Sequence, residues 1–222
     1  MEMKKGITVI LLTWKRPENI KKIIDAFTRQ SIKPKIFLWN NNPDVQFKDD
    51  RVDWIVNSTK DLYSYARWLM IPMVETEYVM TMDDDLMPKS LNFLAQAMDL
   101  VNQHKNIVGP FGKRIIKGSK PYNGEEIRTD YADIIKGRCM CMKTNILKRV
   151  PLGTLGRVRN DDLYVSYYAA GGKKNAHFVS MNLRKATEDL PEGNCGMDQD
   201  PNHMASRNDF INELIKRDGE LK

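Results

Sequence analysis

Three consecutive aspartates follow a run of apolar residues in the segment VMTMDDDLMPKS, residues 79–90. Asp83, Asp84 and Asp85 repel one another, so in a folded protein they need either full solvation or a nearby cation. Carboxylate oxygens suit Mg²⁺ or Mn²⁺, which take further ligands from water and phosphate. The triplet therefore indicates either a solvated acidic turn after a strand or a metal site that would hold a diphosphate.

A second acidic pair, Asp161 and Asp162, stands where the segment NDDLYVSYYAA begins a helical pattern. The positive end of a helix dipole favours acidic residues, so capping alone would explain the pair. The functional interpretation is a carboxylate that faces the reacting carbon of a substrate. The sequence leaves both interpretations open.

Basic side chains supply candidates for binding an anionic ligand. His203 and Arg207 are four residues apart, so a helix would carry both on one face, where they could meet a metal ion and a diphosphate. Arg67 belongs to another helical pattern and is either a further phosphate ligand or, by default, a solvated surface residue.

The elements that must position these residues alternate between strand and helix. Apolar runs in the first half predict strands at residues 7–12, 36–39, 54–56, 78–82 and 107–108. Helical spacing begins at Pro17, near Leu62 and beyond Ser90. The second half is less regular: we expect loops at 111–130, a strand within 132–142, a helix at 162–170, a strand at 177–181, a long loop at 188–202 and a helix at 206–217.

This alternation is typical of an open, largely parallel sheet, in which ligands bind outside the carboxyl ends of the strands. Thr13 to Arg16 follow the first predicted strand, Asn40 ends the second, and the aspartate triplet follows the fourth. We therefore expect all of them at one edge of the sheet.

Length and composition are those of an ordinary globular protein. The chain has 222 residues and a formal net charge of +6, and we expect one domain. No apolar run approaches the roughly 20 residues that span a bilayer, so we expect a cytoplasmic protein. The charge favours an anionic partner. Cys139, Cys141 and Cys195 have neither disulfide nor zinc spacing, so reduced buried thiols are expected.

The chain resembles the exostosin-like glycosyltransferases, the family of the exostosin C-terminal domain. Five segments carry the resemblance, in the family's order: TVILLTWKRPENIKKII, IFLWNNN, LYSYARWLMIPMVETEYVMTMDDDL, NDDLYVSYYAAGGKK and NHMASRNDFINEL. The third contains the family's DxD motif. The resemblance implies a GT-A fold, an α/β domain over residues 1–222 with a mixed central sheet and helices on both faces. Residues 1–108 would be its nucleotide-binding half and 109–222 its acceptor-side half.

The implied activity is transfer of a sugar from a UDP-sugar with Mn²⁺ or Mg²⁺, with retention of the anomeric configuration. By the resemblance, Asp85 would bind the metal together with Asp83, while Asp83 and Asp84 would also hold the ribose. Asp162 would lie beneath the anomeric carbon, with Asp161 as its catalytic neighbour.

The remaining residues would bind the nucleotide. Arg67 and Arg207 would contact the diphosphate, with His203 beside it. The uridine would be framed by Thr13, Arg16 and Asn40. The chain departs from the family pattern at Leu62, where the family usually has Asn.

Two other functions are compatible with parts of the pattern. A sugar-1-phosphate nucleotidyltransferase uses a similar nucleotide-binding half, but it needs a glycine-rich loop where this chain has Thr13-Trp14-Lys15-Arg16-Pro17. A non-catalytic nucleic-acid-binding module would explain the charge and leave the aspartates unused. For a transferase, the acceptor would be a glycan, a lipid-linked glycan or a hydroxylated base in nucleic acid.

Overall fold

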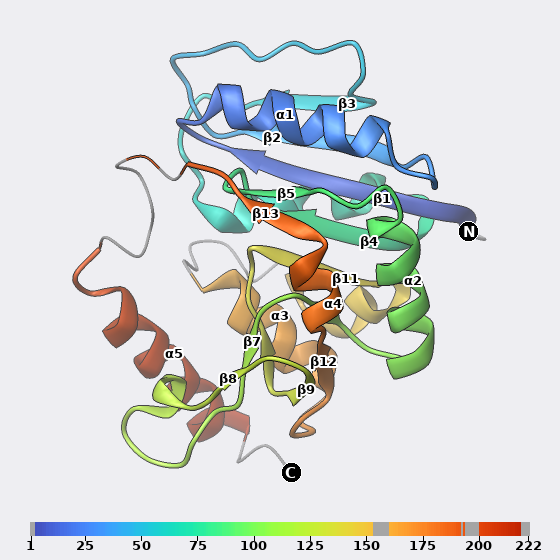
Figure 1. The fold of residues 1–222 in the computed structure, drawn as a ribbon. Helices are drawn as coiled ribbons and strands as arrows, with labels where there is room; N and C mark the ends of the chain where they lie inside the picture. The colour runs from blue at the N-terminus through green and yellow to red at the C-terminus, as the bar shows by residue number, and fades with distance from the viewer. Residues whose placement is uncertain (1–2, 153–159, 192, 194–199, 219–222) are drawn as a thin grey trace.

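The computed structural model describes residues 3–152, 160–191, 193 and 200–218. An eight-stranded mixed sheet crosses the molecule (Figure 1). Its strands, in order across the sheet, are β3 (Trp54–Asn57), β2 (Lys35–Asn40), β1 (Lys4–Thr13), β4 (Thr76–Met82), β11 (Cys139–Lys143), β6 (Val108–Gly109), β12 (His177–Val179) and β9 (Asp130–Ala132). The first four are parallel, and β11 is antiparallel to β4.

Helices and small sheets complete the fold. The α-helices are α1 (Pro17–Thr28), α2 (Phe93–His104), α3 (Asp161–Ala170), α4 (Met181–Lys185) and α5 (His203–Asp218). The 3₁₀ helices are η1 (Ser64–Met73), η2 (Pro121–Asn123) and η3 (Thr144–Arg149). Short strands form two further sheets: β10 (Ile134–Ile135) with β7 (Gly112–Lys113) and β8 (Glu126–Ile127), and β13 (Thr187–Asp189) with β5 (Leu86–Pro88).

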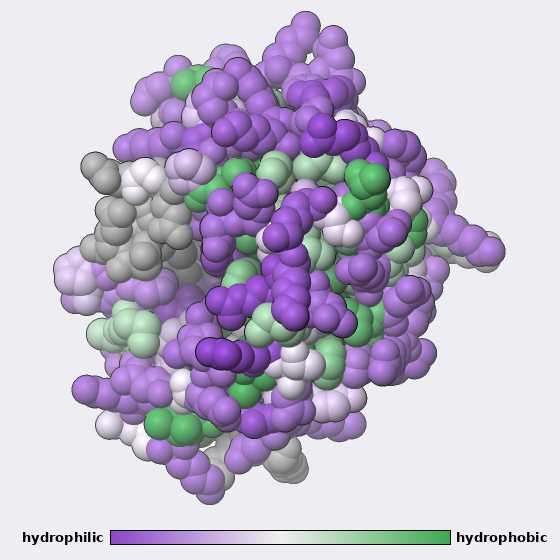
Figure 2. Space-filling view, in the orientation of Figure 1, coloured by the Kyte–Doolittle hydropathy of each residue, from purple (hydrophilic) through white to green (hydrophobic). Residues whose placement is uncertain are grey.

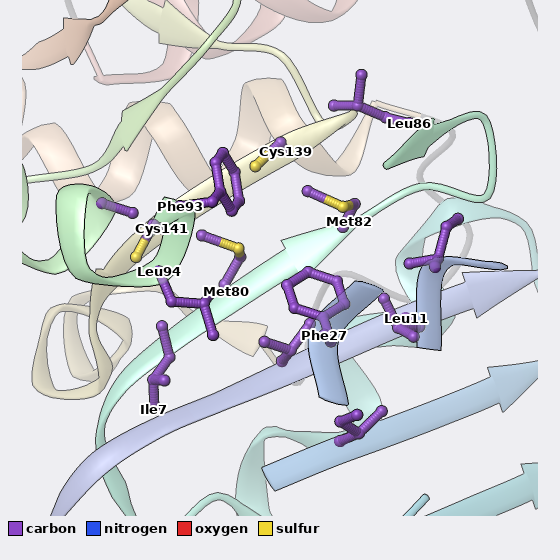
Figure 3. Close-up of a cluster of buried hydrophobic side chains, with 14 of the residues drawn as sticks. Ile7, Leu11, Phe27, Met80, Met82, Leu86, Phe93, Leu94, Cys139 and Cys141 are labelled. Atoms are coloured by element: carbon purple, nitrogen blue, oxygen red, sulfur yellow. The ribbon is translucent and has the colours of Figure 1, made fainter. Parts of the chain in front are cut away.

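Both faces of the central sheet are covered, which explains why β1, β2 and β4 are mainly apolar along their buried parts. Successive side chains of a strand point to opposite faces, so Val9 packs in one core and Ile10 in the other. Residues of α1, α2 and α4 cover the first face, and residues of η1, η3 and α3 cover the second. Figure 3 shows the first core, where Phe27 and Phe93 pack with Met80 and Met82. The predicted α/β architecture, with a mixed sheet and helices on both faces, is confirmed.

Several elements differ from the sequence prediction. The helix expected from Leu62 is the 3₁₀ helix η1, and it contains Pro72, whose missing N–H disfavours an α-helix. Residues 111–130, expected as loops, include β7, η2 and β8, which are too short to show a periodic pattern. The last helix begins at His203, before the predicted start at Ser206. Part of the predicted loop 188–202 lies outside the described residues.

Two of the three cysteines lie in the first core. Cys139 and Cys141 are buried and make no disulfide, so the prediction of reduced thiols is confirmed for this pair. Burial raises the pKa of Cys141 to about 12 and that of Cys139 well above its usual value, so neither is a reactive thiolate. Cys195 lies outside the described residues. In the described part of the chain, we find no helix with the length and apolar character needed to cross a lipid bilayer.

His177 gives the fold a pH-dependent stability. Its ring is fully buried, and Nε2 lies 2.9 Å from the Ser166 carbonyl oxygen. Burial lowers the pKa of His177 to about 4, from 6.5 in a solvated chain. As the pH falls below 6.5 the unfolded chain binds the proton first, so this contribution to stability is complete above 6.5 and disappears by about pH 4.

We therefore expect the unfolding free energy to fall by about 3 kcal/mol between pH 7 and pH 4 through His177 alone. Urea unfolding at a series of pH values would show a flatter acid limb for His177→Gln than for the wild type. His104→Gln is the comparison: burial also lowers the pKa of His104, but its side chain is only partly buried, so this variant should flatten the acid limb less than His177→Gln does. An acid limb that is equally steep in His177→Gln would contradict the assignment.

Candidate functional site

A pocket of about 490 Å³ opens at the carboxyl edge of β1 and β4. Its walls come from the β1–α1 turn, the aspartate triplet, the start of η1, the turn before β11 and the first turns of α3 and α5. It contains all but one of the predicted site residues: Thr13, Arg16, Arg67, Asp83, Asp84, Asp85, Asp161, Asp162, His203 and Arg207. The parallel strands β1 and β4 therefore deliver Thr13, Arg16 and the aspartate triplet to one edge, as the topology predicts. The other pocket residues come from η1, α3 and α5.

Arginines of the protein itself offset the repulsion within the triplet. Each aspartate is paired with a different guanidinium: Arg67 with Asp83 (2.6 Å), Arg16 with Asp84 (2.6 Å) and Arg138 with Asp85 (3.1 Å). The sequence pattern indicated solvent or a metal ion, and not these arginines, as what offsets the repulsion. The three pairs differ in burial, and the differences separate their roles.

Asp84 anchors the turn between β1 and α1. One of its oxygens accepts from Thr13 Oγ1 at 3.1 Å and Trp14 N at 3.3 Å, and the other accepts from Arg16 Nη1 at 2.6 Å. Asn19 Nδ2 donates to its backbone oxygen at 2.9 Å. These contacts indicate that Asp84 shapes the pocket wall. Its hydrogen bonds also hold the side chains of Thr13 and Arg16 in place on that wall.

Asp83 is the most exposed side chain of the triplet, at 28%. Its Oδ1 atom is nevertheless buried, and this burial raises the pKa of Asp83 to about 7. The charge of Arg67 opposes the shift, and the neighbouring charge of Asp85 adds to it. A cation beside Asp83 would favour its ionised form. Asp83 and Asp85 thus offer carboxylate oxygens to the same pocket.

Arg67 is buried, with 2% of its surface exposed, so the expectation of a solvated surface arginine is wrong. Its guanidinium pairs with Asp83, lies 3.5 Å from Asp161, and donates to the carbonyl oxygens of Ser64 (2.9 Å) and Gly137 (2.8 Å). Because these partners occupy much of its hydrogen-bonding capacity, Arg67 holds η1 against the triplet. Direct contact with a diphosphate stays a prediction.

Asp161 is bound on both oxygens by neighbouring side chains. Ser64 Oγ donates to Oδ1 at 2.5 Å and Trp68 Nε1 donates to Oδ2 at 2.6 Å. Both donors belong to η1, so Asp161 ties the start of α3 to that helix. This arrangement favours a structural role for Asp161 over the catalytic role that the resemblance implied.

Asp162, one residue later, accepts hydrogen bonds from three groups. Arg207 Nη2 (2.7 Å) and Gly137 N (3.1 Å) donate to Oδ2, and Leu163 N (2.9 Å) donates to Oδ1. Burial acts to raise the pKa of Asp162, but the charge and hydrogen bond of Arg207 and the backbone donors outweigh it and hold the pKa below its usual value. Asp162 is therefore an ionised carboxylate in the pocket wall.

Gly137 makes this close approach of Asp162 feasible. A Cβ atom at residue 137 would lie 3.3 Å from the Cβ of Asp162, tighter than ordinary van der Waals contact. The same residue accepts from Arg67 and donates to Asp162, so its backbone links the two acidic clusters. No sequence motif marked Gly137 or Arg138 as part of the site.

The prediction that His203 and Arg207 share one helical face is confirmed, since both line the pocket from the first turns of α5. Arg207 is buried, and its guanidinium stacks 4.3 Å from the centre of the Tyr122 ring. The ring and Asp162 together fix the guanidinium. Tyr122 is a further pocket residue that the sequence did not indicate.

Asn40 is the predicted residue that does not line the pocket. Its Nδ2 donates to Val45 O at 2.6 Å and to Asn57 Oδ1 at 2.9 Å, which closes the loop after β2. The next residue, Asn41, faces the pocket instead and donates to the carbonyl oxygen of Tyr63 at 2.9 Å. Tyr63 is a rim residue with a positive φ of 56°, a strained conformation that this hydrogen bond supports.

The site's donor set suits a hard divalent cation that keeps part of its coordination for a ligand. Among the described residues, no three His, Cys, Asp or Glu side chains are grouped as a complete metal site. Mg²⁺-type ions are commonly held by one or two carboxylates together with water and substrate phosphates. Asp83 and Asp85 would supply the two carboxylates. In the described lining, seven aspartates outnumber six lysines and arginines, so an anionic diphosphate would need an added cation.

Comparisons with known proteins indicate the family and the fold of the chain. A family model described as glycosyl transferase family 64 domain matches residues 7–135. The mannosyltransferase PcManGT from Pyrobaculum calidifontis, solved with GDP-Man and Mn²⁺, superposes with a TM-score of 0.55 at 14% identity, over 86% of this chain and 61% of that one. S. aureus TarS 1-349, solved with UDP-GlcNAc, gives 0.54 at 12% identity, over 78% of this chain and 55% of that one.

These likenesses show the GT-A fold. The chain spans about three fifths of the first protein and just over half of the second. No curated protein sequence matched the chain.

Proposed function

Because the chain belongs to the glycosyl transferase family 64 domain family, by the match over residues 7–135, we propose that it transfers a sugar from a nucleotide-diphosphate sugar to an acceptor hydroxyl. The observation that carries the proposal is one pocket with two kinds of carboxylate. Asp83 and Asp85 stand at the end of β4, and the arginine-paired Asp162 stands in the wall formed by α3. The first kind would hold a metal ion for the diphosphate of a sugar nucleotide, and the second would face its sugar.

The proposed donor is a UDP-sugar, held with Mn²⁺ or Mg²⁺ by Asp85 and Asp83. The solved relatives bind two different donors, GDP-Man in PcManGT and UDP-GlcNAc in TarS, so the base is the part of the donor to be tested. We further assign the chain to the exostosin-like branch, on the five segments that resemble that family in order.

When bound, the divalent ion supplies positive charge to the departing nucleoside diphosphate. His203 and Arg207 stand at the start of α5 on the same pocket and add to that field. Arg207 also holds Asp162 at 2.7 Å, which fixes the carboxylate as an anion. Asp162 then stabilises the positive charge that develops on the sugar ring. The acceptor hydroxyl bonds to the anomeric carbon on the face from which the nucleoside diphosphate departs, and its proton passes to the departing phosphate oxygen, so the configuration is retained without a separate general base.

The acceptor is proposed to be polar. On the face shown in Figure 2, hydrophilic residues predominate and apolar ones are scattered. The net charge of +6 suits an anionic acceptor, whether a glycan, a lipid-linked glycan or a hydroxylated base in nucleic acid. Acceptor binding to nucleic acid would weaken steeply between roughly 50 and 200 mM salt.

A nucleotidyltransferase fits the pocket less well. The β1–α1 turn carries no glycine-rich loop, and Asp84 fixes it through Thr13, Trp14 and Arg16. That turn therefore has little freedom to wrap a triphosphate.

The proposal is tested by incubating the protein with a panel of UDP- and GDP-sugars and following release of the nucleoside diphosphate. We expect slow UDP release from one UDP-sugar, only with Mn²⁺ or Mg²⁺ present, and its loss in Asp85→Asn. Release of GDP alone would correct the donor. Pyrophosphate formation from UTP and a sugar 1-phosphate, without transfer from any sugar nucleotide, would replace the proposal with nucleotidyl transfer.

A further inference from the structure

Asp85, the proposed metal ligand, is held by a cation of the protein. Arg138 Nε donates to Asp85 Oδ1 at 3.1 Å, and Nη2 donates to the Asp85 carbonyl oxygen at 3.2 Å. The same Nη2 donates to Asp189 Oδ1 at 2.8 Å. One guanidinium therefore bridges the triplet and the end of β13.

We propose that Arg138 is a resident cation that a divalent metal ion must displace from Asp85, and that Asp189 retains Arg138 once it is displaced. The inference rests on the function proposed above, since it takes Asp85 as a metal ligand. Arg138 would then have a positioning role. It would set the affinity of the site for its metal, and therefore the metal concentration at which the site fills.

Of the three arginines on the triplet, Arg138 is the one placed to move. Its side chain is 26% exposed, whereas those of Arg67 and Arg16 are 2% and 12% exposed. Arg67 is also fixed by two backbone carbonyl oxygens, and Arg16 by the buried Asp84. Displacing either would disturb the pocket wall, while Arg138 can withdraw toward solvent.

Asp189 is a partner that stays within reach. β13 pairs with β5, which places Asp189 opposite Leu86, and Leu190 N donates to the Asp85 carbonyl oxygen at 2.8 Å. The Asp189 carboxylate is largely exposed, so it can follow the guanidinium. The Phe111 ring, 5.1 Å from the Arg138 guanidinium carbon, supplies a stacking surface for it.

Electrostatics decides whether the loss of Arg138 or Asp189 tightens or weakens metal binding. A guanidinium and a divalent ion on the same carboxylate repel each other, so the ion must compete with Arg138. Removing Arg138 should tighten metal binding. Removing Asp189 should weaken it, because a displaced Arg138 would then lose its remaining carboxylate partner.

The test is a titration of the nucleotide-free protein with Mn²⁺, in which the free ion is counted by electron paramagnetic resonance. We expect Arg138→Gln to bind Mn²⁺ about tenfold more tightly than the wild type, and Asp189→Asn to bind it about threefold more weakly. The double variant should match Arg138→Gln, since Asp189 acts only through Arg138. Thermal unfolding of each variant would verify that it is folded.

Arg184→Gln is the matched control. Its guanidinium carbon lies 5.0 Å from the centre of the same Phe111 ring, and among the described residues it forms no ion pair with the triplet. Its Mn²⁺ affinity should equal that of the wild type. A tightening as large as that in Arg138→Gln would reduce the effect to general surface charge and overturn the inference.

The remaining outcomes separate the inference from the proposed function. If Mn²⁺ binds the wild type and is lost in Asp85→Asn, but Arg138→Gln leaves the affinity unchanged or lowers it, the inference is wrong and the metal site stands. If Mn²⁺ binding is lost in Asp189→Asn and is still lost in the double variant, Asp189 acts on the metal directly. That result would also overturn the inference about Arg138. If the wild type binds no Mn²⁺ with or without UDP, the proposed metal site fails and the inference fails with it.

Discussion

Replacing Asp162 by Asn is expected to lower kcat for sugar transfer about a hundred- to a thousand-fold, while UDP affinity stays close to that of the wild type. Asn keeps the size and an acceptor oxygen for Arg207, but it removes the negative charge that we propose to lie beneath the sugar. The pKa of Asp162 lies below its usual value because Arg207 and backbone donors outweigh burial, so this charge is present throughout the neutral pH range. Steady-state kinetics with the donor that the sugar-nucleotide panel identifies would measure the loss.

Asp161→Asn is the adjacent control for this prediction. Asp161 accepts from Ser64 and Trp68 and holds η1, so its replacement should lower the melting temperature while kcat of the folded enzyme changes less than about tenfold. Equal losses of kcat in the two variants would contradict the division of roles between these neighbours. Full activity in Asp162→Asn would remove Asp162 from the mechanism.

Replacing Arg67 by Met should lower the free energy of unfolding by about 3–5 kcal/mol. The substitution leaves the buried Asp161 and the partly exposed Asp83 without their shared cation, and leaves the carbonyl oxygens of Ser64 and Gly137 without the Arg67 donor. Such a loss is a large fraction of the stability of an ordinary domain. Urea unfolding of the wild type and the variant measures this loss, provided that the two proteins have the same m-value.

Arg51→Met is the matched control, because Arg51 pairs with Asp49 at 2.7 Å while its own side chain is 42% exposed to solvent. Screening by solvent should keep its cost below about 1 kcal/mol. A cost for Arg67→Met that is no greater than this would show that the buried network contributes little, and that Arg67 is held for another reason.

The parallel half of the fold could be predicted because its strands are covered on both faces. β1, β2 and β4 each contain a run of mainly apolar residues, and α1 begins at Pro17 with a regular helical spacing. The other half rests on two- and three-residue strands such as β7 and β8. Their pairing depends on contacts far along the chain, so no local periodicity reports it.

Much of the candidate site could be predicted because a parallel sheet gathers the ends of its strands at one edge. The triplet reaches the pocket for that reason, because it directly follows β4, whereas Asp162, His203 and Arg207 reach it from the first turns of α3 and α5. Burial of Arg67 could not be predicted, because it depends on Asp83 and Asp161, which only the tertiary fold brings to it. Arg138 was missed in the same way, since a lone arginine before a strand carries no local signal.

The central claim is that the carboxylates at the end of β4 bind a divalent ion together with a uridine diphosphate. Calorimetric titration of UDP into the wild type, with and without Mn²⁺, tests it most directly. We predict that Mn²⁺ tightens UDP binding by about tenfold or more, and that Asp85→Asn abolishes the gain. Equal UDP affinities in the presence and absence of Mn²⁺ would contradict the claim.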